Sequence, residues 1–431
     1  MLFPGVLPTR FQTDDVGRLL GPRAGLALDL MANKALRVGQ APYEGNAANL
    51  LTFSRPSRAS FFDQGRVLRQ AEANEIRFDH GSVTGAARGV LNEGQRTNLL
   101  KSSAVFDAVD WTKSGVVVGV DAVLAPDGSA SADRLTKTAS AFRHVSQGFS
   151  ASTGPYVASV YLRADTLEIA SLLLSGDEGS TLHARAVVDL STGQVTDFNS
   201  TNLVSASAEK VDGGWWRFSV AANLPVVTNP RLFIYPGIYS EAVAGSVLAW
   251  GAQVEAGFFP TSYIPTTTAA ATRAEDQISA PNDGWLRPDV GSLVLEWESA
   301  GFEVGTIRPL VRFGEGVFNG VGAHVINADR IDVISRGTAG ATSHSFSTKA
   351  GVNCLAMAWA PGRFAASVNG SAVLSGMYYP PVGDVPQLYL GQGAQLAGSS
   401  SSVRKFNGWF RNAVALPVSL TDAELVARSV L

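Results

Sequence analysis

The sequence has little of several residue types on which common functional sites depend. It contains one cysteine, Cys354, so no disulfide can form within the chain. Its 5 histidines are never close enough in sequence to form a local metal-binding pair, and no glycine motif for a nucleotide cofactor is present. Basic and acidic residues nearly balance, 34 against 37, which argues against the basic surface that nucleic acids require. We therefore expect no metal, no cofactor and no nucleic-acid partner.

Long apolar runs are also absent. No segment approaches the roughly 20 apolar residues of a membrane span, so we expect no membrane insertion. The first residues carry prolines at positions 4 and 8 and lack the apolar run of a secretory signal. We expect a protein made in the cytoplasm, which would reach the outside by cell lysis or within an assembled particle.

What the sequence does contain is a series of short strand patterns. Strand-like runs, separated by turn residues every 8 to 12 positions or so, recur along most of the chain, and helical periodicity is nearly absent. A hydrophobic fraction of 45% is ample for packed cores, and 431 residues are too many for one core. We predict an all-β protein with two β-sandwich or jelly-roll domains. Cys354 lies in an apolar strand pattern and is predicted to be buried.

The stretch 247–276 divides the chain. Its first part, VLAWGAQVEAG, alternates like the last strand of a sandwich. Its second part contains Pro260 and Pro265, which remove ladder donors, so it reads as an extended strap between domains. We predict four segments: an N-terminal unit at 1–95, a sandwich at 96–276, a linker at 277–290 and a second sandwich at 291–431.

Several turns and one helix start have clear local signals. The runs ASFFD and RVLRQA flank Gln64 and Gly65, which predicts a hairpin in which the glycine takes the positive φ. Asn369–Gly370 predicts another tight turn. Near the end of the chain, Thr421 and Glu424 have the spacing of a capping box and predict a short helix.

An ordered set of motifs resembles a known class of proteins. The motifs are TFSRPSRASFFDQGRVLRQAEANEIRFDH, VTGAARGVLNEGQRTNLL, GAQVE at 251–255, FPTSYIPT at 259–266, and Thr272–Arg273. Their order and spacing are similar to those of phage and prophage tail-fibre and spike proteins, in which such a segment leads into a carbohydrate-binding-like sandwich. Pro56 departs from the family pattern, which more often has a small residue there. The last residues, 406–431, resemble the closing strand and helix of concanavalin-like or laminin-G-like lectin domains.

The resemblance implies a function as well as a fold. It implies a structural protein of a phage or of a gene transfer agent, such as a tail fibre or head spike. The N-terminal unit would attach to other particle proteins, and the sandwiches would adhere to host cell-surface polysaccharide such as capsule. Such proteins are often trimers, so a homo-oligomer is expected.

Sugar binding requires flat aromatic rings beside planar polar groups. In DGGWWRFSV, alternation places Trp216 and Phe218 toward the core and Trp215 and Arg217 on the opposite, partly exposed face. We predict Trp215 and Arg217 as ligand contacts, with packing at the sandwich rim as the alternative.

Two further clusters lie at predicted sandwich edges. Tyr235 and Tyr239 flank a Pro-Gly turn, and Phe142, Arg143 and His144 follow one another in a loop. These five residues complete the predicted ligand site, again with rim packing as the alternative.

A catalytic site has weak support. Glu296 and Glu298 would share one strand face, as paired carboxylates of glycosidases do. Laminarinase-like sandwiches carry E-x-D-x-E there, and this chain lacks the middle Asp and the last Glu. We expect no enzyme. A polysaccharide-degrading enzyme and a purely structural spacer remain the alternatives.

Overall fold

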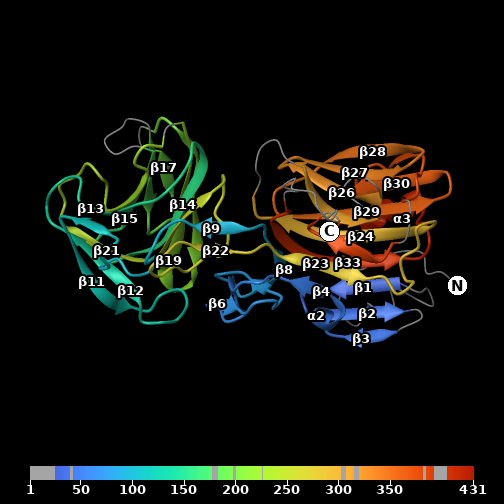
Figure 1. Ribbon diagram of the computed structural model, residues 1–431, viewed down its shortest axis with the longest axis horizontal. Coiled ribbons are helices and arrows are strands. Elements are labelled where there is room, and N and C mark those ends of the chain that lie inside the picture. Colours follow the sequence, from blue (N-terminus) through green and yellow to red (C-terminus); the bar gives the residue numbers. More distant parts are fainter. Residues whose placement is uncertain are drawn as a thin grey trace.

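The computed structural model describes residues 25–38, 42–176, 183–197, 200–225, 227–301, 307–314, 320–381, 385–392 and 405–431. These residues form two β-rich lobes side by side (Figure 1). The described residues within 96–256 form the middle lobe, and those within 25–92 and 277–431, apart from the hairpin at 59–71, form the terminal lobe. Strands dominate both lobes, which confirms the all-β prediction. No helix in the described ranges is long and apolar enough to span a bilayer.

The middle lobe is a sandwich of two antiparallel sheets, M1 and M2. Sheet M1 has the strand order β10 (Thr112–Ser114), β13 (His144–Gly148), β20 (Arg231–Pro236), β15 (Ile169–Ser175), β16 (His183–Asp189) and β17 (Val195–Asp197). Sheet M2 has the order β11 (Val116–Val123), β12 (Ala132–Lys137), β21 (Gly245–Ala256), β14 (Gly154–Ala164), β19 (Trp215–Leu224) and β18 (Leu203–Val211). Their facing sides form one core that includes Leu172, Ile234 and Phe218, all fully buried.

The terminal lobe is a second antiparallel sandwich, of sheets T1 and T2. Sheet T1 has the order β3 (Tyr43–Gly45), β2 (Lys34–Val38), β1 (Gly25–Asp29), β33 (Gly408–Leu416), β24 (Gly291–Ser299), β29 (Val352–Ala360), β30 (Arg363–Val368) and β31 (Leu374–Gly376), with β8 (Ala87–Asn92) and β7 (Phe78–His80) branching from β33. Sheet T2 has the order β28 (Gly340–Ser347), β27 (Arg330–Gly337), β26 (Gly320–Asn327), β25 (Arg308–Phe313), β32 (Gln387–Leu390), β23 (Gln277–Pro281) and β4 (Thr52–Ser54). The core between them includes Leu293, Trp297 and Trp359.

Short elements complete the fold. The hairpin of β5 and β6 and the pair of β9 and β22 lie between the two lobes (Figure 1). The remaining elements are small. Their bounds are β5 (Ala59–Phe62), β6 (Leu68–Ala71), β9 (Arg96–Asn98), β22 (Ala271–Arg273), α2 (Ala47–Leu50), the 3-10 turn η1 (Asp212–Gly214) and α3 (Asp422–Arg428).

The N-terminal segment is not a separate unit, which corrects the prediction for residues 1–95. Strand β1 pairs with β33, with Leu26 opposite Ala415, and β4 pairs with β23, with Phe53 opposite Ile278. Every residue of β1 is buried. An apolar strand needs backbone and side-chain partners, and here the C-terminal sandwich supplies them. Residues 1–24 of the predicted attachment region lie outside the described residues.

The predicted linker at 277–290 is also part of the terminal lobe. Strand β23 runs between β32 and β4 in sheet T2, and its Ile278 is fully buried. Trp285 is buried as well and donates its indole N–H to the Pro281 carbonyl at 2.7 Å. Pro281 ends the strand, a position where a proline is tolerated. Pro281 therefore marks the end of a strand of sheet T2 and not a free linker.

The predictions of single turns, of the helix start and of the buried cysteine are largely confirmed. The hairpin of β5 and β6 forms, although the positive φ of 66° falls on Arg66 and not on Gly65. Asn369 and Gly370 have φ angles of 52° and 75°, as a tight turn requires. The capping box of Thr421 starts helix α3, and Cys354 is buried.

Candidate functional site

Five aromatic rings gather on the outer face of sheet M1; we call this set, Phe142, His144, Phe233, Tyr235 and Tyr239, the aromatic face. Alternation along β20 turns Leu232 and Ile234 into the core and Phe233 and Tyr235 outward. The ring centroids of His144 lie 5.0 Å from Phe233 and 5.3 Å from Tyr235. Tyr235 and Tyr239 are 6.0 Å apart. The rings therefore form one continuous cluster.

The loop before β13 places one of these rings in solvent. Phe142 is 57% exposed, and its φ is 60°, in the left-handed region that large side chains rarely occupy. Its N–H donates to the Tyr239 carbonyl at 2.7 Å, and the two rings lie 5.6 Å apart. An exposed aromatic ring held in a strained backbone conformation is a feature that clusters at functional sites.

Arginine borders the aromatic face. The Arg185 guanidinium lies 3.8 Å from the Tyr239 ring centroid, although the residue is only 7% exposed. Arg231 donates to the Thr112 hydroxyl at 3.1 Å, across β10 and β13. Sequence reasoning missed both arginines. The signal was available in HARAVVD, where Arg185 alternates with core alanines.

The phenol of Tyr235 stays protonated at neutral pH. Burial raises the pKa of Tyr235 to about 12, against the opposing effect of the nearby Arg185 charge. A neutral phenol can both donate and accept a hydrogen bond. Together with the flat rings and the bordering arginines, this gives a surface suited to a ligand with apolar faces and hydroxyl edges.

The structure brings together most, but not all, of the predicted ligand residues. Phe142, His144, Tyr235 and Tyr239 meet on the aromatic face. Arg143 instead packs against Gly115, where an added Cβ would lie 2.3 Å from the Arg143 Cδ.

Trp215 and Arg217 lie on the other sheet, M2. The prediction that Trp215 is a partly exposed ligand contact is wrong. Trp215 is 2% exposed and packs with Leu68, Trp250 and Tyr263. The predicted alternation is right, because Phe218 faces the core. The part of the outer M2 face around Trp215, however, is covered by the β5–β6 hairpin and the strap after β21, which local alternation cannot reveal.

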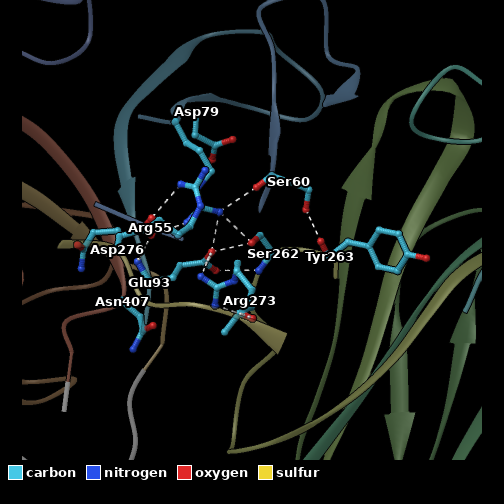
Figure 2. Close-up of polar contacts among 12 residues, drawn as sticks. Arg55, Ser60, Asp79, Glu93, Ser262, Tyr263, Arg273, Asp276 and Asn407 are labelled. Atoms are coloured by element: carbon cyan, nitrogen blue, oxygen red, sulfur yellow. Dashed lines mark hydrogen bonds and ion pairs between the residues drawn. The ribbon is translucent and has the colours of Figure 1, made fainter. Parts of the chain in front are cut away.

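A buried ionic network, which we call the junction, binds the two segments that connect the lobes, 93–95 and 257–276, to the terminal lobe (Figure 2). The Arg77 guanidinium binds Glu93 at 2.8 Å and Asp276 at 2.5 Å. Arg55 also pairs with Asp276, at 3.1 Å, and Arg273 with Glu93, at 2.9 Å. All five residues are buried. Burial alone would raise the pKa of Glu93, but the Arg273 and Arg77 charges hold it at about 2.

The motifs that suggested a family contribute to this junction. Arg55 and Arg77 come from the first motif, Glu93 from the second and Arg273 from the last. The remaining two motifs bind each other. Gln253 accepts the Ile264 N–H at 2.6 Å, and Glu255 accepts the Thr261 N–H at 2.9 Å. The motif pattern therefore contributes to how the lobes join.

Glu296 and Glu298 each have a partner. Glu298 pairs with Arg88 at 2.8 Å, and Glu296 accepts from the Asn412 amide at 2.7 Å. Burial raises the pKa of Glu296. Within the described residues no group of three or more His, Cys, Asp and Glu side chains could hold a metal ion.

Comparison with known proteins adds distant fold likenesses. No protein-family model and no curated protein match the chain. Among solved structures, the carbohydrate-binding module CBM40 of the Ruminococcus gnavus IT-sialidase, bound to alpha2,3 sialyllactose, is 17% identical, with a TM-score of 0.27, over 33% of this chain and 83% of that one. A Trypanosoma rangeli sialidase in complex with sialic acid is 11% identical, with a TM-score of 0.28, over 68% and 59%. Domains LG4-5 of the mouse laminin alpha1 chain are 12% identical, with a TM-score of 0.22, over 73% and 93%. At these values the likeness assigns neither a family nor a ligand.

Proposed function

We propose that the protein is a non-enzymatic adhesin that holds cell-surface polysaccharide on the aromatic face of its middle lobe. The observation that carries this proposal is the cluster of five rings whose outermost member, Phe142, is more than half exposed. Pyranose rings stack their C–H faces on aromatic rings, and their hydroxyls bind planar cations and phenols. Arg185, stacked on Tyr239, and the phenol of Tyr235 supply such groups at the same place.

The setting we propose is a phage or gene-transfer-agent particle, as a tail fibre or head spike. The ordered motifs support this setting. Since the N-terminal strands are part of the terminal lobe, attachment to other particle proteins would involve that lobe rather than a separate unit. A trimer would raise weak sugar affinity through effective concentration. The protein would be made in the cytoplasm and released by lysis.

The test is binding of the full chain to bacterial cells with and without capsule, and to an array of bacterial polysaccharides. We expect capsule-dependent binding that falls at least about tenfold in the double variant Phe142→Ala with Tyr239→Ala, because the stacking surface is lost. Met377→Ala is the matched control, because Met377 is 56% exposed on the terminal lobe. Equal loss in Met377→Ala would contradict the proposed site.

Two rivals give different results in the same experiment. A purely structural spacer predicts no binding to either cell type by the folded wild-type protein. A polysaccharide-degrading enzyme predicts release of reducing ends from the bound polysaccharide, with loss of that release in Glu298→Gln.

A further inference from the structure

A cleft of about 370 Å³ lies between the lobes, outside the site described above. One wall is the outer face of sheet M2, and the other is formed by Trp409 and Arg88 of the terminal lobe, with Phe62 of the β5–β6 hairpin at the edge. The volume falls in the range of ligand pockets in proteins, about 300–1,000 Å³. Clefts at domain interfaces are common places for such pockets.

The M2 wall presents two polar rows set by strand register. In the first row Tyr161 of β14 lies opposite Arg217 of β19, which lies opposite Glu209 of β18. The second row is Ser159, Ser219 and Ser207 in the same three strands. Three strands therefore present hydroxyl, guanidinium and carboxylate groups together.

Several of these groups lack partners within the protein. Tyr161 is 1% exposed, yet no described residue forms a hydrogen bond with its hydroxyl, although the residue lines the cleft. The buried Nε of Arg217 is also without a partner, while its terminal nitrogen donates to Ser159 at 3.1 Å. Glu209 is exposed and forms no ion pair with any described residue. A buried polar group without a partner is costly unless a ligand or water satisfies it.

The polar groups of the opposite wall have partners within the protein. The Arg88 guanidinium lies 3.3 Å from the Trp409 ring centroid and pairs with Glu298. The Trp409 indole N–H donates to Asp79 at 2.7 Å. The Trp409–Arg88 wall therefore bounds the cleft sterically, whereas the M2 wall supplies the free hydrogen-bonding groups.

The geometry points to a second carbohydrate site in this cleft, for one or two neutral sugar units held by the Tyr161 hydroxyl, Arg217 and Glu209. A neutral ligand fits because Arg217 and Glu209 lie opposite each other with cancelling charges, and Arg88 is already neutralised by Glu298. Sugar hydroxyls both donate and accept, as a guanidinium beside a carboxylate requires. This site does not depend on the aromatic face, and a ligand here would touch both lobes.

The test uses the full chain carrying Phe142→Ala and Tyr239→Ala, so that binding to the aromatic face is removed. Calorimetry with neutral trisaccharides (maltotriose, laminaritriose, chitotriose) and acidic ones (trigalacturonate, sialyllactose) reports what still binds. We expect neutral probes to bind and Tyr161→Phe to weaken binding by about 3- to 10-fold, the value of one hydrogen bond. Tyr161→Phe removes a hydroxyl without an internal partner, so thermal stability should not fall.

Each outcome is decisive. Binding by neutral probes that Tyr161→Phe and Glu209→Gln both weaken supports the cleft. No binding, binding by acidic probes alone, or binding unaffected by both substitutions overturns it. If the double variant does not fold, Tyr161→Phe is compared with wild type on the same probes. Wild-type binding that Phe142→Ala removes and Tyr161→Phe leaves unchanged supports the proposed function and rejects the cleft.

Discussion

At the junction, Arg77 and Glu93 are withdrawn from water and every charge meets an opposite charge within about 3 Å. On the aromatic face, Phe142 is 57% exposed and holds a backbone conformation that costs energy. Four of the five junction residues come from three motifs, and the five span more than 200 positions of the chain, whereas the aromatic face is built from two strands and two loops of one sheet. The clearest sequence signals therefore belong to the structural joint, and the surface suited to a ligand has no motif.

The largest effect should come from breaking the junction. Arg77→Ala leaves two buried carboxylates without their shared partner, and we expect a loss of about 4–5 kcal/mol in the free energy of unfolding. Chemical denaturation measures this. Arg58→Ala is the control, because its ion pair with Glu72 is exposed and contributes about 0–1 kcal/mol. Similar losses of unfolding free energy in both variants would mean that the buried ion pairs of the junction stabilise the fold no more than an exposed ion pair does.

Trp215→Ala tests the residue that the sequence assigned to the wrong environment. Because the ring is buried under the β5–β6 hairpin, we expect a loss of about 3–4 kcal/mol in unfolding free energy. Polysaccharide binding by the folded fraction should be unchanged. A stable variant that has lost binding would restore Trp215 as a ligand contact.

The pH dependence of stability should reveal the junction as well. The pKa of Glu93 is about 2 in the folded protein, below its ordinary 4.5. Its ionised carboxylate therefore contributes fully to the free energy of unfolding above pH 4.5, and this contribution is lost as the pH falls toward 2. Glu93→Gln mimics the protonated side chain. At neutral pH we expect this substitution to lower the free energy of unfolding by about 2–3 kcal/mol. The difference in unfolding free energy between the variant and wild type should narrow between pH 4.5 and 2. If denaturation curves show a constant difference in unfolding free energy from pH 4.5 to 2, Glu93 does not form the predicted ionic contacts.

The smallest stability effect, with the opposite sign, should occur on the aromatic face. Phe142→Gly relieves the positive φ, so unfolding free energy should rise by up to about 1 kcal/mol. Polysaccharide binding should nevertheless fall, because the exposed ring is gone. A variant that is both less stable and fully active would mean that Phe142 serves packing alone.

Much of the local structure could be predicted from the sequence. Strand alternation placed Phe218 in the core and Trp215 on the other face, and turn residues located hairpins such as that of β5 and β6. The aromatic clusters around Phe142 and Tyr239 were found as separate candidates. That they meet, with Arg185 stacked on Tyr239, depends on the pairing of β13, β20, β15 and β16, which no local pattern specifies.

The strands, most turns and the helix cap follow from local sequence, because they depend on side-chain alternation, φ preferences and hydrogen bonds within a few residues. Which surfaces face solvent depends on how distant segments pack. The tertiary structure joined β1 and β4 to the C-terminal sandwich, made the supposed linker a strand, covered Trp215 and left Phe142 exposed. Burial depends on segments far apart in the sequence that pack against each other, and such contacts leave no periodic trace in either segment alone.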